Sequence, residues 1–235
     1  MKIGYYPGCS LHGTGRELDE SLKAVAGALG CELAELPDWS CCGASSALVT
    51  NSFLGVALPA RNLALAESAG HDTVLAPCAA CFNRLAGARR AAAEDPALAA
   101  RLPELLGRPI ATSVRVRNVV DLLHDLAPAI KAAATRPLSG LKVACYYGCL
   151  LVRPAEVCDF DDPEQPTFME DVVRATGATP VEWAARLGAG LHSASEGTIR
   201  VGGLPIGDVD MAGWRRQLGY IPQESILFND TIINN

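Results

Sequence analysis

Five cysteines in the first third of the chain are spaced as in a metal site. They are Cys9, Cys41, Cys42, Cys78 and Cys81, in the pattern C-x31-C-C-x35-C-x-x-C. A C-x-x-C pair can hold one metal ion, whereas the sulfurs of two adjacent cysteines point apart and suit a body several atoms wide. Five thiolates also exceed the four that a tetrahedral zinc ion or an ordinary iron–sulfur cluster takes. The pattern therefore predicts an iron–sulfur cluster of unusual ligation, and zinc is the alternative.

Composition indicates the setting of such a site. The chain has 235 residues and nine cysteines without an N-terminal hydrophobic signal region, which indicates reduced thiols used in metal or redox chemistry. Its net charge of −6 comes from 20 basic and 26 acidic residues. The basic residues form no stripe, so nucleic acid is not an expected partner. No apolar run reaches the ~18 residues that cross a bilayer, and we expect a cytoplasmic protein without a membrane span.

Short strands lead into each group of cysteines. Apolar runs predict strands over residues 2–6, 31–36 and 73–76. Cys9 follows the first strand, the adjacent pair follows the second, and the C-x-x-C turn follows the third. Because α/β sheets place their sites at the carboxyl ends of strands, the sequence predicts an α/β fold with the five cysteines at one end of a small parallel sheet.

Helices are expected between these strands. Thr14-Gly15-Arg16-Glu17 reads as a capping box that opens the first helix, and Gly30 ends it. The second helix spans roughly Asn51 to Ala69, and an Ala-rich helix follows Cys81. The first helix is predicted to bury one face made of Leu18, Leu22, Val25, Ala26 and Leu29.

The start of the chain is repeated. Residues 2–9 align with residues 142–149 at an offset of 140 positions, so that Cys149 matches Cys9. A helix around residues 167–176 and a strand over residues 179–183 continue the second copy. The same module therefore begins twice.

The second copy lacks its own adjacent cysteines. They would fall near residues 187–191, where the sequence is Leu-Gly-Ala-Gly-Leu, and no cysteine occurs after Cys158. Cys145 and Cys158 have no ligand counterpart in the first copy and are interpreted as bystanders. A second site with five thiolates is therefore not expected within this chain.

Residues 1 to about 186 resemble the cysteine-rich CCG domains in the B-type subunit of heterodisulfide reductase. The resemblance rests on the cysteine spacing, the Cys41-Cys42-Gly43 triplet and the repeated Tyr-Tyr start before Gly-Cys. In that family each of two CCG domains holds a noncubane [4Fe-4S] cluster through five cysteines, and the chemistry at the clusters cleaves a disulfide reductively. The resemblance implies one such cluster per chain here. It assigns as its ligands Cys9, Cys41, Cys42, Cys78 and Cys81, with Cys149 as the first ligand of the incomplete second domain.

The resemblance also implies partners and leaves other functions open. In the family, electrons arrive from a C-like iron–sulfur subunit, and in cytoplasmic complexes an A-like flavin subunit lies upstream. The expected activity is that of an oxidoreductase subunit acting on a disulfide, with the chemistry at the cluster and no catalytic side chain singled out. The alternatives are a single-cluster electron-relay or docking module, and a CCG subunit of a lactate- or glycolate-oxidising complex.

The end of the chain has a different character. Residues 196–235 resemble the part of an ABC-transporter ATPase between the phosphate loop and the Q-loop, and Gln223 matches the glutamine of that loop. The phosphate loop itself needs G-x-x-x-x-G-K-[ST], and no lysine of this chain follows a glycine. We infer a chimeric chain with a junction near residues 187–195.

Three segments result from these patterns. They are a complete first CCG domain at 1–135, a truncated second CCG domain at 138–187 and a β-rich ABC ATPase-like fragment at 193–235. The predicted fold is α/β, with tandem CCG-type domains whose small parallel sheets are flanked by helices.

Overall fold

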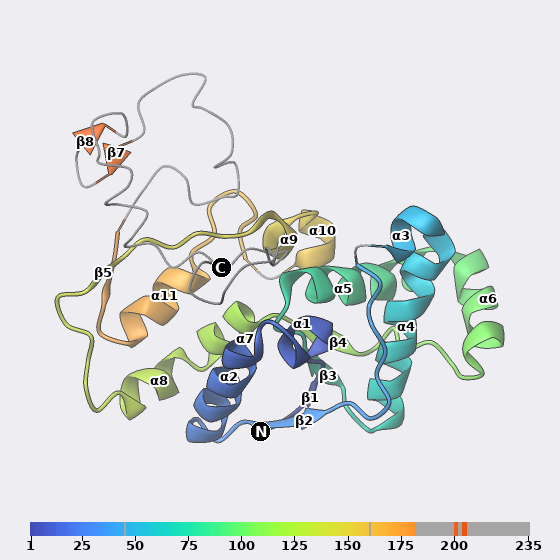
Figure 1. Ribbon diagram of the computed structural model, residues 1–235, viewed down its shortest axis with the longest axis horizontal. Helices are drawn as coiled ribbons and strands as arrows, with labels where there is room; N and C mark the ends of the chain where they lie inside the picture. Colours follow the sequence, from blue (N-terminus) through green and yellow to red (C-terminus); the bar gives the residue numbers. More distant parts are fainter. Residues whose placement is uncertain (45, 160, 182–199, 202–203, 206–235) are drawn as a thin grey trace, which may run out of the picture. The chain divides into compact units, whose positions relative to one another are not determined.

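A computed structural model describes residues 1–44, 46–159, 161–181, 200–201 and 204–205. The chain forms two compact units, residues 1–189 and 190–235, and most of what is described belongs to the first (Figure 1).

Four parallel strands form the main sheet of the first unit. In chain order they are β1 (Lys2–Tyr5), β2 (Glu32–Glu35), β3 (Thr73–Leu75) and β4 (Arg115–Arg117). Their spatial order is β2-β1-β3-β4, so the direction in which the sheet grows reverses between β1 and β3. Such a switch point is where open α/β sheets bind ligands, beyond the carboxyl ends of the strands.

Helices connect the strands and cover both faces of this sheet. They include the short α1, α3, α7 and α8 and the longer α2, α4, α5 and α6. Their bounds are α1 (Gly8–His12), α2 (Arg16–Ala28), α3 (Ala47–Thr50), α4 (Ser52–Ser68), α5 (Ala79–Glu94), α6 (Pro96–Leu106), α7 (Val119–Asp125) and α8 (Ala127–Ala133).

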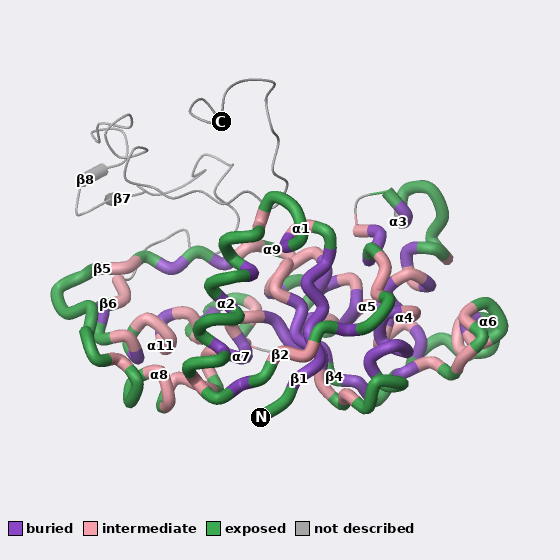
Figure 2. Tube along the Cα trace, turned by 60° about the horizontal axis from the view of Figure 1, so that its bottom comes forward, coloured by how far each residue is buried: buried purple, intermediate pink, exposed green. Residues whose placement is uncertain are grey.

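Alternation along the strands divides the buried core into two layers. Tyr5 and Leu75 pack on one face against Leu22 of α2 and Leu122 of α7. Val74 faces the opposite way and packs with residues of α4 and α5, including Leu63, Ala66, Phe82 and Leu85. Successive residues of a strand point to opposite faces, so even the three-residue strand β3 contributes side chains to both layers. The two inner strands, β1 and β3, are accordingly among the most buried segments, whereas the edge strand β2 is intermediate to exposed (Figure 2).

A second, smaller parallel sheet belongs to the repeated segment. β5 (Lys142–Val143) pairs with β6 (Thr179–Pro180), and α9 (Cys149–Val152), α10 (Ala155–Cys158) and α11 (Phe168–Ala175) lie between them. The hydroxyl of buried Tyr147, which follows β5, donates a hydrogen bond to Glu170 of α11 at 2.7 Å and so connects these two parts of the segment. The predicted α/β class with small parallel sheets flanked by helices is thus confirmed.

Three sequence expectations differ from the structure. The box at Thr14 does not cap α2, which begins one residue later behind Gly15 and has no side-chain cap. Leu18 and Val25 are 41% and 40% exposed, because the first-layer core is narrow and takes mainly Leu22 and Ala26 from that helix. β4 was not predicted, since two of its three residues are arginines.

The second unit is described only at β7 (Arg200–Val201) and β8 (Leu204–Pro205), which pair antiparallel. The remainder of the ABC-like stretch, Gln223 included, lies outside the described residues, as does the proposed junction at 187–195. Across the described residues, no helix is both long and apolar enough to cross a membrane.

Candidate functional site

The predicted ligands follow three neighbouring strands of the main sheet. Cys9 lies in α1 directly after β1, the adjacent pair follows β2, and Cys78 precedes α5, which contains Cys81, after β3. Because the three strands are parallel, all five thiols come to the same edge of the sheet, around the switch point. The structure thus places the five predicted cysteines at one end of the fold.

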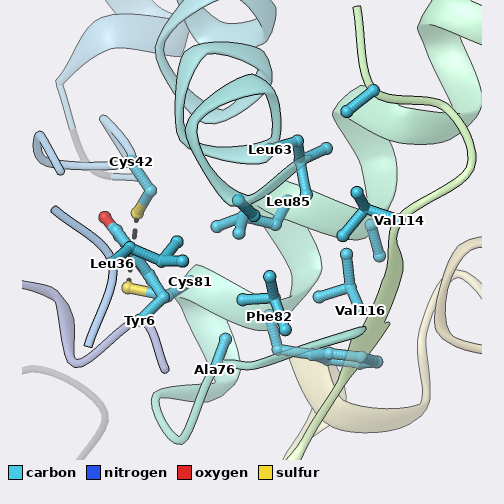
Figure 3. Packing of buried hydrophobic residues seen from close by; sticks show 14 of the residues in the cluster. Tyr6, Leu36, Cys42, Leu63, Ala76, Cys81, Phe82, Leu85, Val114 and Val116 are labelled. Atoms are coloured by element: carbon cyan, nitrogen blue, oxygen red, sulfur yellow. Dashed lines mark hydrogen bonds between the residues drawn. The ribbon is translucent and has the colours of Figure 1, made fainter. Parts of the chain in front are cut away.

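The thiols are linked in part by hydrogen bonds. The sulfurs of Cys42 and Cys81 are 3.4 Å apart (Figure 3), Cys81 also contacts Cys78, and Cys9 contacts Cys41. Cys9 and Cys41 are exposed, Cys78 is intermediate, and Cys42 and Cys81 are buried. Within the described part of the chain, no group of three or more His, Cys, Asp or Glu side chains is arranged to hold a metal ion.

The surroundings favour thiolates at two of these cysteines. The pKa of Cys78 falls to about 6, chiefly because the Cys81 thiol donates to its sulfur, with further help from backbone N–H groups at the start of α5 and from Ser10. The pKa of Cys42 falls to about 7, again chiefly through the Cys81 thiol. The pKa of Cys81 is raised, chiefly by its hydrogen bonds with Cys42 and Cys78, and burial raises the pKa of Cys41. The ionisation of Cys78 thus falls below neutral pH, and that of Cys42 falls close to it.

Two glycines allow the loops to close around the thiols. Gly8 and Gly43 have φ angles of +66° and +71°, a region that side chains with a Cβ rarely adopt. A Cβ at Gly8 would lie 2.9 Å from the sulfur of Cys81, and a Cβ at Gly43 would lie 2.6 Å from the Cβ of Ala47. The Gly43 N–H also donates to the sulfur of Cys41 at 3.4 Å. Both positions require glycine for the chain to approach the sulfurs.

Polar groups outside the cysteine pattern also belong to this site. The Tyr6 hydroxyl donates to the Ser40 carbonyl at 2.8 Å. Burial raises the pKa of Tyr6, and the negative charge of the surrounding thiolates raises it further. The Asn62 amide bonds the backbone of Ser40. Cysteine spacing could not reveal Asn62, but an asparagine inside the predicted helix 51–69, next to the apolar segment 63–66, was a signal for it.

Comparisons with known proteins identify the family. The cysteine-rich CCG domain matches residues 3–86. The 8-methylmenaquinol:fumarate reductase membrane anchor subunit of Wolinella succinogenes is 36% identical over 197 residues, which are 82% of this chain and 68% of that protein. The chain belongs to the CCG cysteine-rich family. The B-type subunit of a CoB-CoM heterodisulfide reductase from Methanosarcina acetivorans is 31% identical over 79% of this chain and 63% of its own length. The chain thus spans about two thirds of the length of these CCG relatives.

Two further similarities concern the fold and the end of the chain. A hypothetical protein from Helicobacter pylori has the same fold as 78% of this CCG chain, with a TM-score of 0.53 at 11% identity, over 33% of its own length. The ABC multidrug transporter E of Aspergillus fumigatus is 49% identical over 41 residues, 17% of this chain and 3% of the transporter. The predicted likeness of a short fragment to ABC transporters is confirmed.

The cysteines of the second CCG-like copy differ in their positions, and Cys158 belongs to the same buried cluster as Cys42 and Cys81. Cys149 is exposed at the start of α9, and within the described residues no hydrogen bond joins it to the other predicted ligands. Cys145 and Cys158 are buried. Burial raises the pKa of Cys158 to about 11. Residues 187–191, where the second pair would fall, lie outside the described residues.

Proposed function

We propose that this protein is an iron–sulfur subunit of the heterodisulfide reductase B type, which cleaves a disulfide substrate at one noncubane [4Fe-4S] cluster. The observation that carries the proposal is the convergence of five thiols from three loops on one sheet edge. The ligands would be Cys9, Cys41, Cys42, Cys78 and Cys81.

The donor set and its cradle fit such a group. Thiolates are the ligands of iron–sulfur clusters, and Cys42 and Cys78 have lowered pKa values. Gly8 keeps the space beside the Cys81 sulfur free of a side chain, and the Gly43 N–H donates to the Cys41 sulfur. The hydroxyl of Ser40 is buried without a hydrogen-bond partner among the described residues, so a polar donor is available beside the adjacent pair.

The burial of the thiols determines how a substrate would approach. Cleavage of a disulfide consumes two electrons and two protons and yields two thiols, and a bound cluster would supply electrons one at a time. Exposed Cys9 and Cys41 form the solvent side of the site, whereas Cys42 and Cys81 lie beneath them. A disulfide would therefore approach past Cys9 and Cys41. Tyr6 keeps its proton because its pKa is raised, and its hydroxyl holds the Ser40 carbonyl in place.

A second candidate function is a single-cluster electron relay. It is favoured by the 36% identity to a subunit of a fumarate reductase, an enzyme whose name specifies no disulfide substrate. The absence of cysteines after Cys158 also favours a role with one cluster. A CCG subunit of a lactate- or glycolate-oxidising complex is a separate, third candidate.

The remaining assignments extend this proposal. We propose a C-like iron–sulfur subunit and an A-like flavin subunit as electron donors, and a cytoplasmic location. The segments would be a complete CCG domain at 1–135, a truncated one at 138–187 and an ABC ATPase-like fragment at 193–235, joined near residues 187–195. Sequencing across that junction in the source DNA tests the chimeric origin. An uninterrupted natural gene there would contradict an artificial origin of the junction.

Anaerobic purification with iron, sulfide and zinc analysis and EPR spectroscopy tests the cluster. We expect about four iron atoms and an EPR signal per chain, and Cys42→Ser should abolish the signal. Cys31→Ser is the matched control, because Cys31 and Cys42 are each 2% exposed and Cys31 is not a predicted ligand. Zinc without sulfide would contradict the proposal. Reduction of a heterodisulfide with an artificial electron donor then separates the reductase from the relay.

A further inference from the structure

Asn62 lies within α4, and its amide is used entirely by one residue of a distant loop. Its Oδ1 accepts from the Ser40 N–H at 2.9 Å, and its Nδ2 donates to the Ser40 carbonyl at 2.9 Å. The side chain is 0% exposed. Asparagine is a poor helix former, and a buried amide must have partners. Both facts point to a role in the loop rather than in the helix.

The bonded carbonyl belongs to the peptide that leads into the adjacent cysteines. The Ser40 carbonyl is part of the bond to Cys41, and it accepts a second hydrogen bond from the Tyr6 hydroxyl at 2.8 Å. Tyr6 follows β1 and Asn62 lies in α4, so two separate elements hold one peptide. The Ser40–Cys41 peptide thus accepts two hydrogen bonds at its carbonyl oxygen, and the bond from the Ser40 N–H to Asn62 holds the preceding peptide, so the backbone on both sides of Ser40 is fixed.

The same loop is held differently two residues earlier. Arg61, beside Asn62 in α4, donates to the carbonyl of Asp38 at 2.7 Å and to its carboxylate at 2.6 Å. The Asp38 side chain is 81% exposed, so this contact faces water, where ion pairs contribute little. The buried amide of Asn62, rather than the ion pair of Arg61 with the exposed Asp38, therefore anchors the loop at the cysteine pair.

The other end of the pair is constrained as well. Gly43 follows Cys42 with φ +71°, and its N–H donates to the Cys41 sulfur. The adjacent cysteines thus lie between an anchored peptide and a glycine whose conformation few residues can adopt. Because their two sulfurs diverge from neighbouring α-carbons, a rotation of the Ser40–Cys41 peptide would move both.

We infer that Asn62, assisted by Tyr6, is a positioning residue that fixes the Ser40–Cys41 peptide and so sets where the thiols of Cys41 and Cys42 lie. The effect of Asn62 on a bound cluster rests on the proposed function, whereas its effect on the positions of the Cys41 and Cys42 thiols does not. Asn62→Ala removes two of the three bonds, and Tyr6→Phe removes the third while keeping the ring.

Alkylation of the metal-free, reduced chain tests the inference independently of any cluster. Cys42 and Cys31 are equally buried but lie in different core clusters, so their ratio separates local opening from global unfolding. We expect Asn62→Ala to raise the alkylation rate of Cys42 relative to Cys31 about tenfold, with a smaller rise for Tyr6→Phe. Arg61→Ala and Leu102→Ala, a variant in a separate buried cluster, should leave the ratio unchanged.

Equal acceleration of both cysteines in Asn62→Ala, or no acceleration, would overturn the inference. In the reconstituted protein, Asn62→Ala should change the EPR line shape or lower iron per chain more than Leu102→Ala does. A wild-type chain that takes up no iron and sulfide would overturn the proposed function, and the alkylation ratio would still decide the role of Asn62.

Discussion

The hydroxyl of Tyr5 donates a 2.6 Å hydrogen bond to the carboxylate of Asp19, and so joins the end of β1 to the first turn of α2. Lys23 donates to the other carboxylate oxygen at 2.8 Å. Burial would raise the pKa of Asp19, but these two hydrogen bonds outweigh it and hold the pKa below its usual value. The carboxylate form is therefore part of the folded structure.

Asp19→Asn should lower the free energy of unfolding by about 1.5–3 kcal/mol at pH 7, because hydrogen bonds to a charged acceptor are lost. An Asp whose pKa is lowered by folding stabilises the fold above its unfolded pKa, about 3.9, and this contribution is lost as pH falls through the folded pKa. The difference between variant and wild type should thus shrink below pH 4. Urea titrations from pH 3 to pH 7 measure it, and a difference independent of pH would contradict the prediction.

Gly43→Ala should destabilise the chain by roughly 2–4 kcal/mol, since it combines a left-handed backbone with crowding against Ala47 and Leu58. Gly70→Ala is the matched control: its φ is +77°, but no atom lies within 4 Å of the added Cβ. It should cost only about 1–2 kcal/mol, the backbone part of the effect. Thermal unfolding of both variants gives the comparison, and equal losses would show that crowding contributes nothing.

Asn83→Ala should loosen the segment that contains Cys149. From α5, the buried Asn83 amide donates to the carbonyls of Leu150 and Arg153 at 3.2 and 2.7 Å. We expect hydrogen exchange of residues 149–158 to accelerate about tenfold, the effect of losing roughly 1.4 kcal/mol of local stability. Arg90→Ala removes a more exposed bond to the same segment, at Glu156, and should change exchange much less. Unchanged exchange in Asn83→Ala would contradict this coupling.

Asp121→Ala should be among the more damaging single substitutions. Arg117 is 6% exposed and bonds both carboxylate oxygens of Asp121, at 2.7 and 2.9 Å. Among the described residues, removing the carboxylate leaves the buried guanidinium with only the exposed Asp125 carboxylate as an acidic partner, which costs about 3–5 kcal/mol. The double variant Arg117→Met/Asp121→Ala should recover much of this loss. A double variant no more stable than Asp121→Ala, by chemical denaturation, would contradict the argument.

The sequence predicted β1, β2, β3 and the position of α4 well, because turn residues bound each of these segments, and Asn51 does cap α4 as a helix start requires. It missed β4, whose single inward-facing valine between two arginines carries no periodic signal. The cysteine spacing located the thiols at the strand ends. It did not reveal Asn62 or Tyr6, because their roles depend on hydrogen bonds to a residue more than 20 positions away.

The parallel order of the main sheet has a consequence for how the protein would mature in the cell. β1 pairs with strands about 30 and 70 residues further along the chain, so the cysteine loops meet only after these distant pairings have formed. Contacts of such long sequence separation form slowly. Assembly of the proposed cluster would then follow assembly of the sheet, and the newly made chain would pass through a stage in which its thiols are not yet gathered at the sheet edge.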